Sequence, residues 1–162
     1  MNIAFIDGQN LHLGVYDDGI NFNYKKFRVY LRDKYNVEEA YYFLGAIRDD
    51  VSSLKLYSDL QIAGYILYFR EHNSKLIGKK KGNVDTDIVF EMMKSLVERI
   101  DFDKIVLVSG DGDYKRVVDY LIIKNKFLKI LFPHRKYASS LYKSLGSEFY
   151  DYIYNIKSYV EN

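Results

Sequence analysis

The sequence predicts a three-layer α/β/α domain built on a central, mainly parallel sheet of about five strands. Short apolar runs recur along the chain, as expected of strands whose two faces are both covered. Stretches with helical spacing of apolar residues lie between these runs, and such alternation favours parallel strands joined by right-handed crossovers. The length of 162 residues fits one domain, so we expect residues 1–162 to form a single unit.

Two of the predicted strands are continuously apolar. The first is IAFI at residues 3–6, which is stopped by Asp7 and Gly8. Another is IVLV at residues 105–108, which is followed by Ser109. Runs of this kind are typical of central strands that are buried on both faces. The other predicted strands cover residues 40–44, 65–69 and 128–132.

The predicted helices lie between and after these strands, at about residues 24–34, 51–63, 84–100, 114–124 and 138–145. Their apolar residues recur every three or four positions, which is the spacing of a helix with one buried face. Two segments are expected to be mobile loops, at residues 8–23 and 72–83. In a parallel sheet the crevice beyond the carboxyl ends of the strands is the usual ligand site. Polar residues directly after strands are therefore the first candidates for function.

Composition excludes several classes of site and protein. The chain has no cysteine, which rules out disulfides and thiolate ligands, so any metal must be bound by oxygen or imidazole. No apolar stretch approaches the roughly 20 residues that span a bilayer, and the first residues lack the basic segment and cleavage site of a signal peptide. We therefore expect a cytoplasmic protein that does not insert into a membrane.

Net charge alone does not predict a nucleic-acid partner, because 24 Lys and Arg are balanced by 22 Asp and Glu. Basic residues do cluster, in Lys79-Lys80-Lys81 and at residues 124–126 and 134–136. A solvated surface is the simplest interpretation of any one of these runs. The 17 Tyr and 10 Phe offer surface for base stacking, although most of that surface must be core.

Carboxylates follow both apolar strands. Asp7 directly follows residues 3–6, and Asp111 comes shortly after residues 105–108. If these strands are parallel neighbours, both carboxylates project into the same crevice. Asp113 lies two residues further on, at the predicted start of a helix, where a helix cap explains an aspartate about as well as ligation does.

The helix predicted at residues 84–100 adds another acid. At about 100° per residue, Asp85 falls in the middle of the apolar stripe, whereas Asp87 falls among charged residues on the opposite face. A carboxylate on the buried face is costly unless a proton, a cation or hydrogen bonds neutralise it. Asp85 is therefore a candidate ligand, with an N-cap role as the alternative, and Asp87 is expected to be a solvated acid. The stripe consists of Val84, Ile88, Met92, Leu96, Val89 and Ile100.

Clustered carboxylates predict a divalent cation. Acids that are held close together repel one another, and a cation offsets that charge. Ligand sets made only of oxygen favour Mg²⁺ or Mn²⁺. Such an ion can activate water, and a pair of ions roughly 3.5–4 Å apart can also stabilise the leaving oxygen of a phosphodiester. Asp7, Asp85, Asp111 and Asp113 are therefore the predicted metal ligands of a site for phosphoryl chemistry.

Three stretches around these acids resemble the NYN domain family, a branch of the PIN-like nucleases that includes the bacterial LabA-like proteins. They are FIDGQN at residues 5–10, KGNVD at residues 81–85 and LVSGDGDY at residues 107–114. They occur in the order of the family, and the resemblance covers roughly residues 1–150. Tyr114 stands where the family usually has Phe, a departure that is expected to be harmless. Near the C-terminus, where relatives often carry a further acid before an aromatic residue, this chain reads LGSEF at residues 145–149, and no metal ligand is predicted from this last helix.

The resemblance implies a PIN-like fold, a divalent metal held by the four aspartates, and endonuclease action on RNA. It also implies that Asn10 positions substrate or water, and that Ser109 supports its loop or a phosphate. We therefore predict a metal-dependent endoribonuclease that cuts single-stranded RNA with the four aspartates and Asn10. Lys79, Lys80 and Lys81 are expected to engage the phosphate backbone.

Other functions remain open. The chain could be a non-catalytic module on the same fold, which binds RNA or a regulatory protein partner, or a metal-dependent hydrolase of small phosphate esters. Of the three histidines, His12 is expected to lie nearest the site. The tyrosine-rich segment at residues 149–159 is expected to pack either on its own domain or on a second copy, which leaves a homodimer open.

Overall fold

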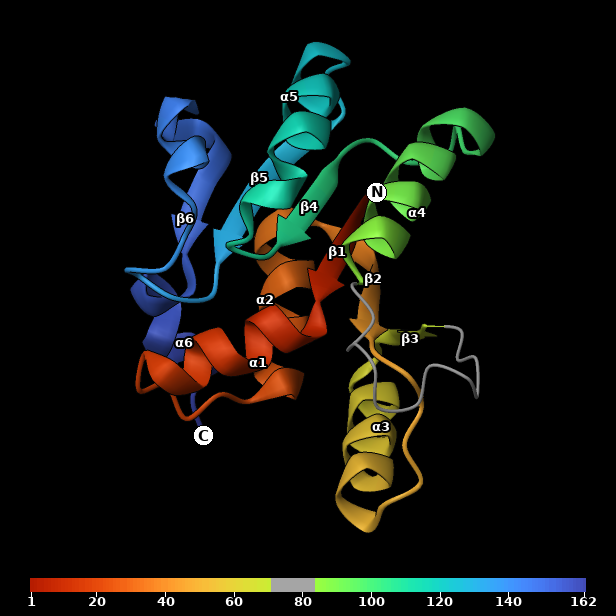
Figure 1. Cartoon of the computed structure of the whole chain (residues 1–162), viewed down its shortest axis with the longest axis vertical. Coiled ribbons are helices and arrows are strands. Elements are labelled where there is room, and N and C mark those ends of the chain that lie inside the picture. Colours follow the sequence, from red (N-terminus) through yellow and green to blue (C-terminus); the bar gives the residue numbers. More distant parts are fainter. Residues whose placement is uncertain (71–83) are drawn as a thin grey trace.

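The computed structural model describes residues 1–70 and 84–162, in which six strands form one sheet (Figure 1). The strand order is β3-β2-β1-β4-β5-β6, and neighbouring strands are parallel throughout. The predicted α/β fold with a parallel sheet is confirmed, but the sheet has six strands where about five were expected. The strands are β1 (Asn2–Asp7), β2 (Val37–Leu44), β3 (Ile66–Phe69), β4 (Ile105–Val108), β5 (Phe127–Phe132) and β6 (Tyr150–Tyr152).

The helices of the described residues agree only in part with the prediction. Two of the expected helices differ: α4 ends two residues early, so that Ile100 is 99% exposed, and residues 138–145 contain a 3₁₀ turn at Ser140–Ser144. The helices are α1 (Gly8–Asp17), α2 (Tyr24–Tyr35), α3 (Val51–Ala63), α4 (Asp85–Glu98), α5 (Lys115–Ile123) and α6 (Lys157–Val160).

The prediction of a loop at residues 8–23 is wrong, because α1 occupies residues 8–17 of this segment. The helix begins where the Asp7 carboxylate accepts a hydrogen bond from the backbone N–H of Asn10, which is an N-cap contact. The large side chains that α1 buries are Leu11 and Val15. Two apolar positions are too sparse a pattern to reveal a helix in the sequence.

Strand β6 escapes prediction because it has only three residues at the edge of the sheet. It pairs with β5, and Ile153 and Val160, which follow it, are fully buried. The tyrosine-rich segment therefore packs on the chain's own sheet, which is one of the two expected outcomes.

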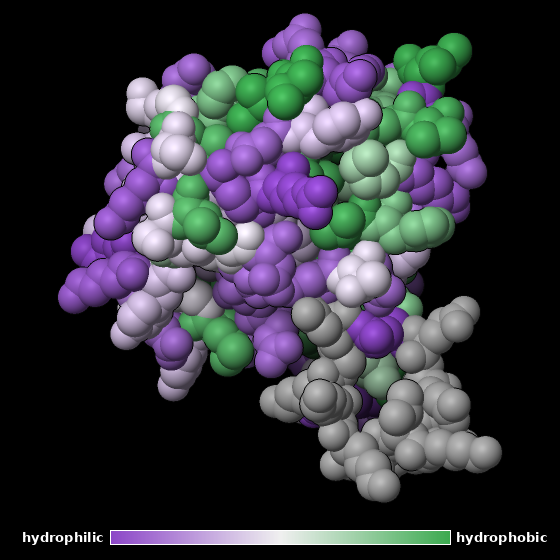
Figure 2. Space-filling model, turned by 45° about the horizontal axis from the view of Figure 1, so that its top comes forward, coloured by the Kyte–Doolittle hydropathy of each residue, from purple (hydrophilic) through white to green (hydrophobic). Residues whose placement is uncertain are grey.

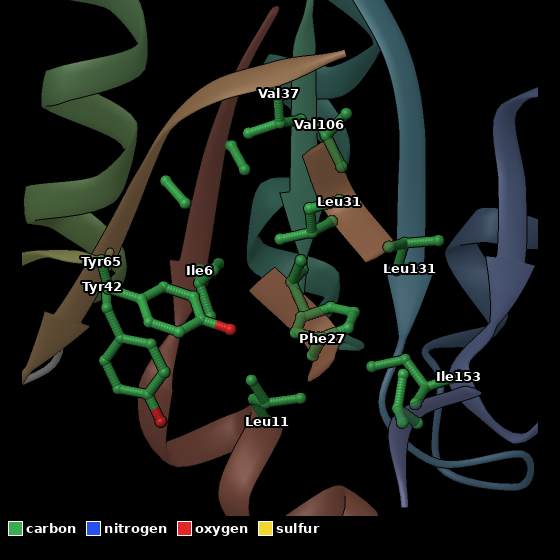
Figure 3. Close-up of a cluster of buried hydrophobic side chains, with 14 of the residues drawn as sticks. Ile6, Leu11, Phe27, Leu31, Val37, Tyr42, Tyr65, Val106, Leu131 and Ile153 are labelled. Carbon is green, nitrogen blue, oxygen red and sulfur yellow. The ribbon is translucent and has the colours of Figure 1, made fainter. Parts of the chain in front are cut away.

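Helices cover both faces of the sheet, so the core has two parts. Residues of β1 alternate between them: Ala4 and Ile6 belong to the first part, and Ile3 and Phe5 belong to the second. Figure 3 shows the first part, where Ile6 of β1 lies on the face of the sheet that is covered by the helices carrying Leu11, Phe27 and Leu31. The second part packs against α4 and α5 through Ile88, Met92, Val117, Val118 and Leu121.

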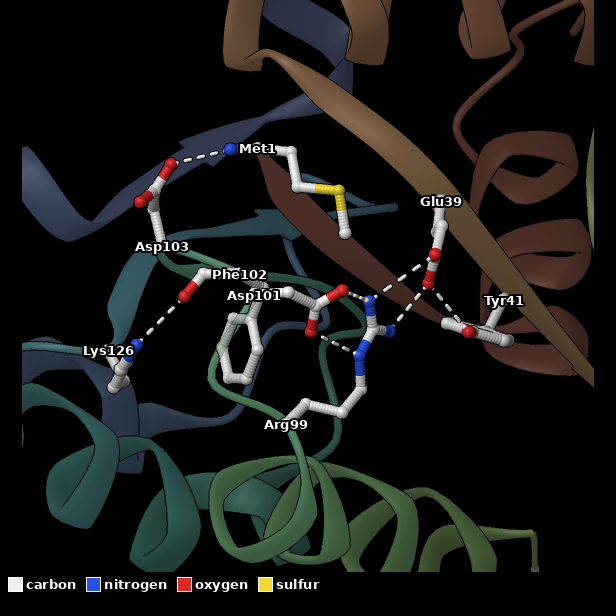
Figure 4. A network of polar contacts seen from close by, with 8 residues as sticks. All are labelled: Met1, Glu39, Tyr41, Arg99, Asp101, Phe102, Asp103 and Lys126. Carbon is white, nitrogen blue, oxygen red and sulfur yellow. Dashed lines mark hydrogen bonds and ion pairs between the residues drawn. The ribbon is translucent and has the colours of Figure 1, made fainter.

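An ion-pair network ties the amino ends of the central strands together (Figure 4). Arg99, which follows α4, contacts Glu39 of β2 at 2.6 Å and Asp101 at 2.7 Å. The terminal amino group of Met1 contacts Asp103 at 2.6 Å. The network therefore holds β1, β2 and the segment before β4 together at the end of the sheet opposite to the carboxyl ends of the strands.

The surface is mixed in character. Figure 2 shows a face on which hydrophilic residues predominate and hydrophobic residues form separate patches. In the part of the chain that the structure describes, no helix combines the length and the apolar character needed to cross a bilayer.

Candidate active site

The carboxyl ends of β1 and β4 lie side by side at the centre of the sheet, where the order of the strands reverses. From β1 the chain continues through β2 and β3 on one side of the sheet, and β4, β5 and β6 follow on the other side. The connections after β1 and β4 diverge at such a switch point and leave a crevice between them. A cleft of about 520 Å³ opens here. Its lining includes the predicted metal ligands Asp7, Asp85, Asp111 and Asp113.

Asp7 lies at the buried end of this cleft, with 4% of its surface exposed. One carboxylate oxygen caps α1, and the other lies 3.1 Å from the hydroxyl of Tyr114 and 3.5 Å from that of Ser109. Burial raises the pKa of Asp7, and the nearby charge of Asp111 raises it further, while the hydrogen bonds to Asn10, Tyr114 and Ser109 lower it. The carboxylate is therefore held in one orientation in a setting that disfavours its negative charge.

Asp85 is the first residue of α4 and faces inward, as predicted, with 8% of its surface exposed. It is not the N-cap, because Val84 occupies that position. Burial is the largest of the causes that raise the pKa of Asp85 to about 6, and the charges of Asp111 and Asp7 add to it. Asp87 is half-buried and does not line the cleft.

Tyr114 connects these two acids. Its phenol oxygen lies 2.8 Å from Oδ1 of Asp85 and 3.1 Å from Oδ2 of Asp7. A phenol has one proton and can donate it to only one carboxylate. The second contact is therefore a hydrogen bond only when one of the two acids is protonated. When both acids are ionised, another positive group must offset the repulsion between the second carboxylate and the phenol oxygen.

Asp111 and Asp113 lie on the turn after β4. Asp111 caps the 3₁₀ turn Gly112–Tyr114 by accepting a hydrogen bond of 2.9 Å from the N–H of Asp113. Capping therefore explains why an aspartate stands at position 111. It does not explain Asp113, which is exposed. One carboxylate oxygen from each of Asp85, Asp111 and Asp113 lies within 4.8 Å of the other two.

Asn10 and Ser109 hold the turn after β4 in place. The side-chain oxygen of Asn10 accepts a hydrogen bond of 2.9 Å from the N–H of Gly110, which joins α1 to this turn. The hydroxyl of Ser109 accepts a hydrogen bond of 3.1 Å from the N–H of Asp111. Ser109 is fully buried, which favours the loop-supporting role over direct contact with a phosphate.

These residues suit a hard divalent cation. The donors are carboxylate oxygens, which Mg²⁺ and Mn²⁺ prefer. Within residues 1–70 and 84–162, Asp7, Asp111 and Asp113 take part in none of the ion pairs with Lys, Arg or His. The repulsion among the clustered acids is what a bound cation would relieve.

Two glycines let α1 lie close to the site. A Cβ on Gly8 would lie 2.6 Å from the carbonyl oxygen of Phe43, and a Cβ on Gly14 would lie 2.5 Å from Cβ of Pro133. Pro133 lines the cleft. The position of α1 relative to the acids therefore depends on the absence of these two side chains.

Sequence reasoning missed several residues of the site. The hydroxyl of Tyr114, which was expected to be harmless, contacts two predicted ligands. Tyr142 donates a hydrogen bond to the carbonyl of Asp111. His134 lines the cleft, and His12 does not. His12 is exposed, and its Nδ1 contacts the hydroxyl of Tyr24. The only sequence signal for Tyr114 was its departure from the Phe of the family.

The basic run Lys79-Lys80-Lys81 lies outside the described residues, so its engagement with a phosphate backbone stays a prediction. Residues 147–149 form a 3₁₀ turn with Glu148 exposed. This glutamate is not among the residues that line the cleft.

Comparison with known proteins gives the family. The family model of the NYN domain matches residues 3–153. The chain is 25% identical over 165 residues to the low amplitude and bright protein LabA of Synechococcus elongatus, with 97% of this chain and 86% of that protein covered.

The crystal structure of a protein of unknown function from Vibrio parahaemolyticus has the same fold. It superimposes with a TM-score of 0.76 at 19% identity, and the match covers 94% of this chain and 91% of that chain. Because the NYN match covers nearly all of the chain, including every element that carries the acidic cleft, the protein belongs to the NYN domain family of PIN-like nucleases.

Proposed function

We propose that this protein is an endoribonuclease that depends on Mg²⁺ or Mn²⁺ and hydrolyses phosphodiester bonds of single-stranded RNA in the cytoplasm. The observation that carries the proposal is the group of carboxylate oxygens from Asp85, Asp111 and Asp113, which lie within 4.8 Å of one another. They share a cleft with the buried Asp7. Membership of a nuclease family supports the hydrolytic assignment.

In this proposal Asp85, Asp111 and Asp113 hold the cation, and Asp7 adds a fourth carboxylate. When bound, Mg²⁺ or Mn²⁺ would offset the charge of the acids and the phosphate and would lower the pKa of water. Tyr114 keeps Asp7 and Asp85 in a fixed relative position through its hydroxyl.

The remaining site residues receive the substrate. Asn10 lines the cleft, and its side-chain oxygen is engaged by Gly110, so its amide nitrogen is the group available to substrate or water. Asp113 is the exposed member of the cluster and lines the cleft, so we assign it to the side on which the substrate enters. We assign Lys79, Lys80 and Lys81 to the phosphate backbone, because ammonium groups bind phosphate without regard to sequence.

Cleavage of a single-stranded RNA by the purified chain tests the proposal. Cleavage is expected with Mn²⁺ or Mg²⁺ and is expected to stop in EDTA. Asp7→Asn and Asp111→Asn should each reduce the rate by on the order of 10- to 100-fold or more, since even the residues that support metal ligands have effects of that size. Asp87→Asn is the matched control, because Asp87 lies on α4 but not in the cleft. Circular dichroism should show the same fold for all variants.

The outcomes separate the alternatives. Retained cleavage in both Asp7→Asn and Asp111→Asn would overturn the proposed site. RNA binding without cleavage would favour a non-catalytic module that acts with RNA or a regulatory protein, and hydrolysis of mononucleotides in preference to RNA would favour a small phosphate ester as substrate. A homodimer also stays a prediction, which the molecular mass in solution can test.

A further inference from the structure

Two aromatic rings lie stacked beside the acidic cluster. The rings of His134 and Tyr137 have centroids 4.1 Å apart and an interplanar angle of 30°. Both residues line the same cleft as Asp85, Asp111 and Asp113. We call this pair the stacking shelf.

His134 is the fixed part of the shelf. It is 8% exposed, and its Nδ1 accepts a hydrogen bond of 2.9 Å from the backbone N–H of Lys136. Its Nε2 lies 3.9 Å from Asp18, and Asp18 in turn pairs with Arg135 at 2.9 Å. The hydrogen bond at Nδ1 therefore orients the ring, and Asp18 lies near its other nitrogen.

The shelf is attached to the turn that carries the acids. The N–H of Ser139 donates a hydrogen bond of 2.9 Å to the carbonyl of Gly110, and Tyr142 donates one to the carbonyl of Asp111. These contacts flank Tyr137 on its C-terminal side. The stacked rings and the metal-binding carboxylates are therefore held at a defined separation.

Tyr137 is the exposed part of the shelf, with 73% of its surface accessible. One face of its ring is covered by His134, so the other face is the natural surface for a further ring. A base that stacks there finds the tyrosine already ordered, which reduces the entropy lost on binding. Lys136 is exposed and takes part in none of the ion pairs of the described residues, so a cation is available for an adjacent phosphate.

We propose that the stacking shelf binds one unpaired nucleobase of the RNA whose phosphate enters the acidic cleft. This inference rests on the proposed function and extends it, because it assigns the protein a base-binding subsite beside the site of cleavage. Stacking uses the face of the base and is tolerant of sequence. The subsite therefore favours single-stranded over paired RNA, since a paired base has both faces covered by its neighbours in the helix.

Binding of two matched oligoribonucleotides to the full chain in EDTA tests the shelf without cleavage. One oligomer consists of adenosines, and the other has abasic sites in their place. Tyr137→Leu should weaken binding of the adenosine oligomer roughly 10-fold and leave the abasic oligomer unchanged, because leucine still covers His134 but cannot stack as an aromatic ring does. Tyr137→Phe should bind as the wild type does.

Tyr16→Leu is the control, because Tyr16 is exposed to a similar extent, 76%, and does not line the cleft. It should bind both oligomers as the wild type does. Equal affinity of Tyr137→Leu and wild type for the adenosine oligomer would overturn the shelf, as would an equal loss on both oligomers. Adenosine monophosphate that binds as tightly as the oligomer would assign the shelf to a free nucleotide and overturn the RNA subsite.

The shelf and the proposed function can fail separately. If the wild type cleaves RNA with Mn²⁺ but Tyr137→Leu binds adenosine oligomer unchanged, only the shelf is wrong. If the wild type neither binds nor cleaves RNA, both proposals are wrong.

Discussion

The hydroxyl of Tyr114 lies 2.8 Å from Oδ1 of Asp85, which connects the turn after β4 to the first residue of α4. Because the same oxygen lies 3.1 Å from Oδ2 of Asp7, one phenol contacts acids from two separate elements.

Tyr114→Phe is expected to lower the free energy of unfolding by about 1.5–3 kcal/mol in EDTA above neutral pH. The ring still packs in the core, but the one hydrogen bond that the phenol donates to the buried carboxylates is lost, and a hydrogen bond to a charged group contributes about that much. Urea denaturation measures the change. Tyr120→Phe is the control, because that tyrosine is partly exposed on α5 and should give no change. Equal stability of Tyr114→Phe and wild type would show that the hydroxyl is dispensable without metal.

The stability of the metal-free protein should fall as the pH rises from about 4 to 6. Burial and the neighbouring acids raise the pKa of Asp85 from 3.8 to about 6 in the folded chain, so the folded state binds the proton more tightly than the unfolded state. Stability is then lost as Asp85 ionises. Asp85→Asn should reduce this slope, and the slope that remains belongs to groups such as Asp7, whose pKa is also raised.

Denaturation in EDTA across this pH range measures the slope. Asp87→Asn, two residues further along α4, should leave the slope as in the wild type. Addition of Mn²⁺ above pH 6 should stabilise the wild type by binding to the folded state. Parallel curves for Asp85→Asn and wild type would contradict the assignment of the slope to Asp85.

Gly14→Ala is expected to destabilise the protein by on the order of 1–3 kcal/mol, the usual size of an overpacking effect. Alanine favours a helix by roughly 1 kcal/mol over glycine, but its Cβ would lie 2.5 Å from Cβ of Pro133, so α1 and Pro133 must move apart. Thermal or urea unfolding shows whether the substitution lowers or raises the free energy of unfolding. Gly45→Ala has nothing within 4 Å of the new Cβ and should change stability by less than about 0.5 kcal/mol. A stabilising effect of Gly14→Ala would mean that α1 does not pack this tightly.

The features predicted well from the sequence are those that local chemistry determines. The runs at residues 3–6 and 105–108 are strands whose side chains are apolar on both faces of the sheet. Asp85 faces inward because its position on the helix falls within the apolar stripe. The site residues came together because Asp7 and Asp111 each follow a strand, and β1 and β4 are neighbours. The roles of these residues, and the unity of residues 1–162 as one domain, stay predictions.

The tertiary structure alone decided the features that depend on distant contacts. Helix α1 and strand β6 have too few buried residues to show a pattern, and each is defined by what it packs against. The hydroxyl of Tyr114 is significant only because Asp7 and Asp85 converge on it, from positions far from it in sequence. A sequence pattern reports the direction in which a side chain points relative to its own element, whereas the partner it meets depends on how the elements pack.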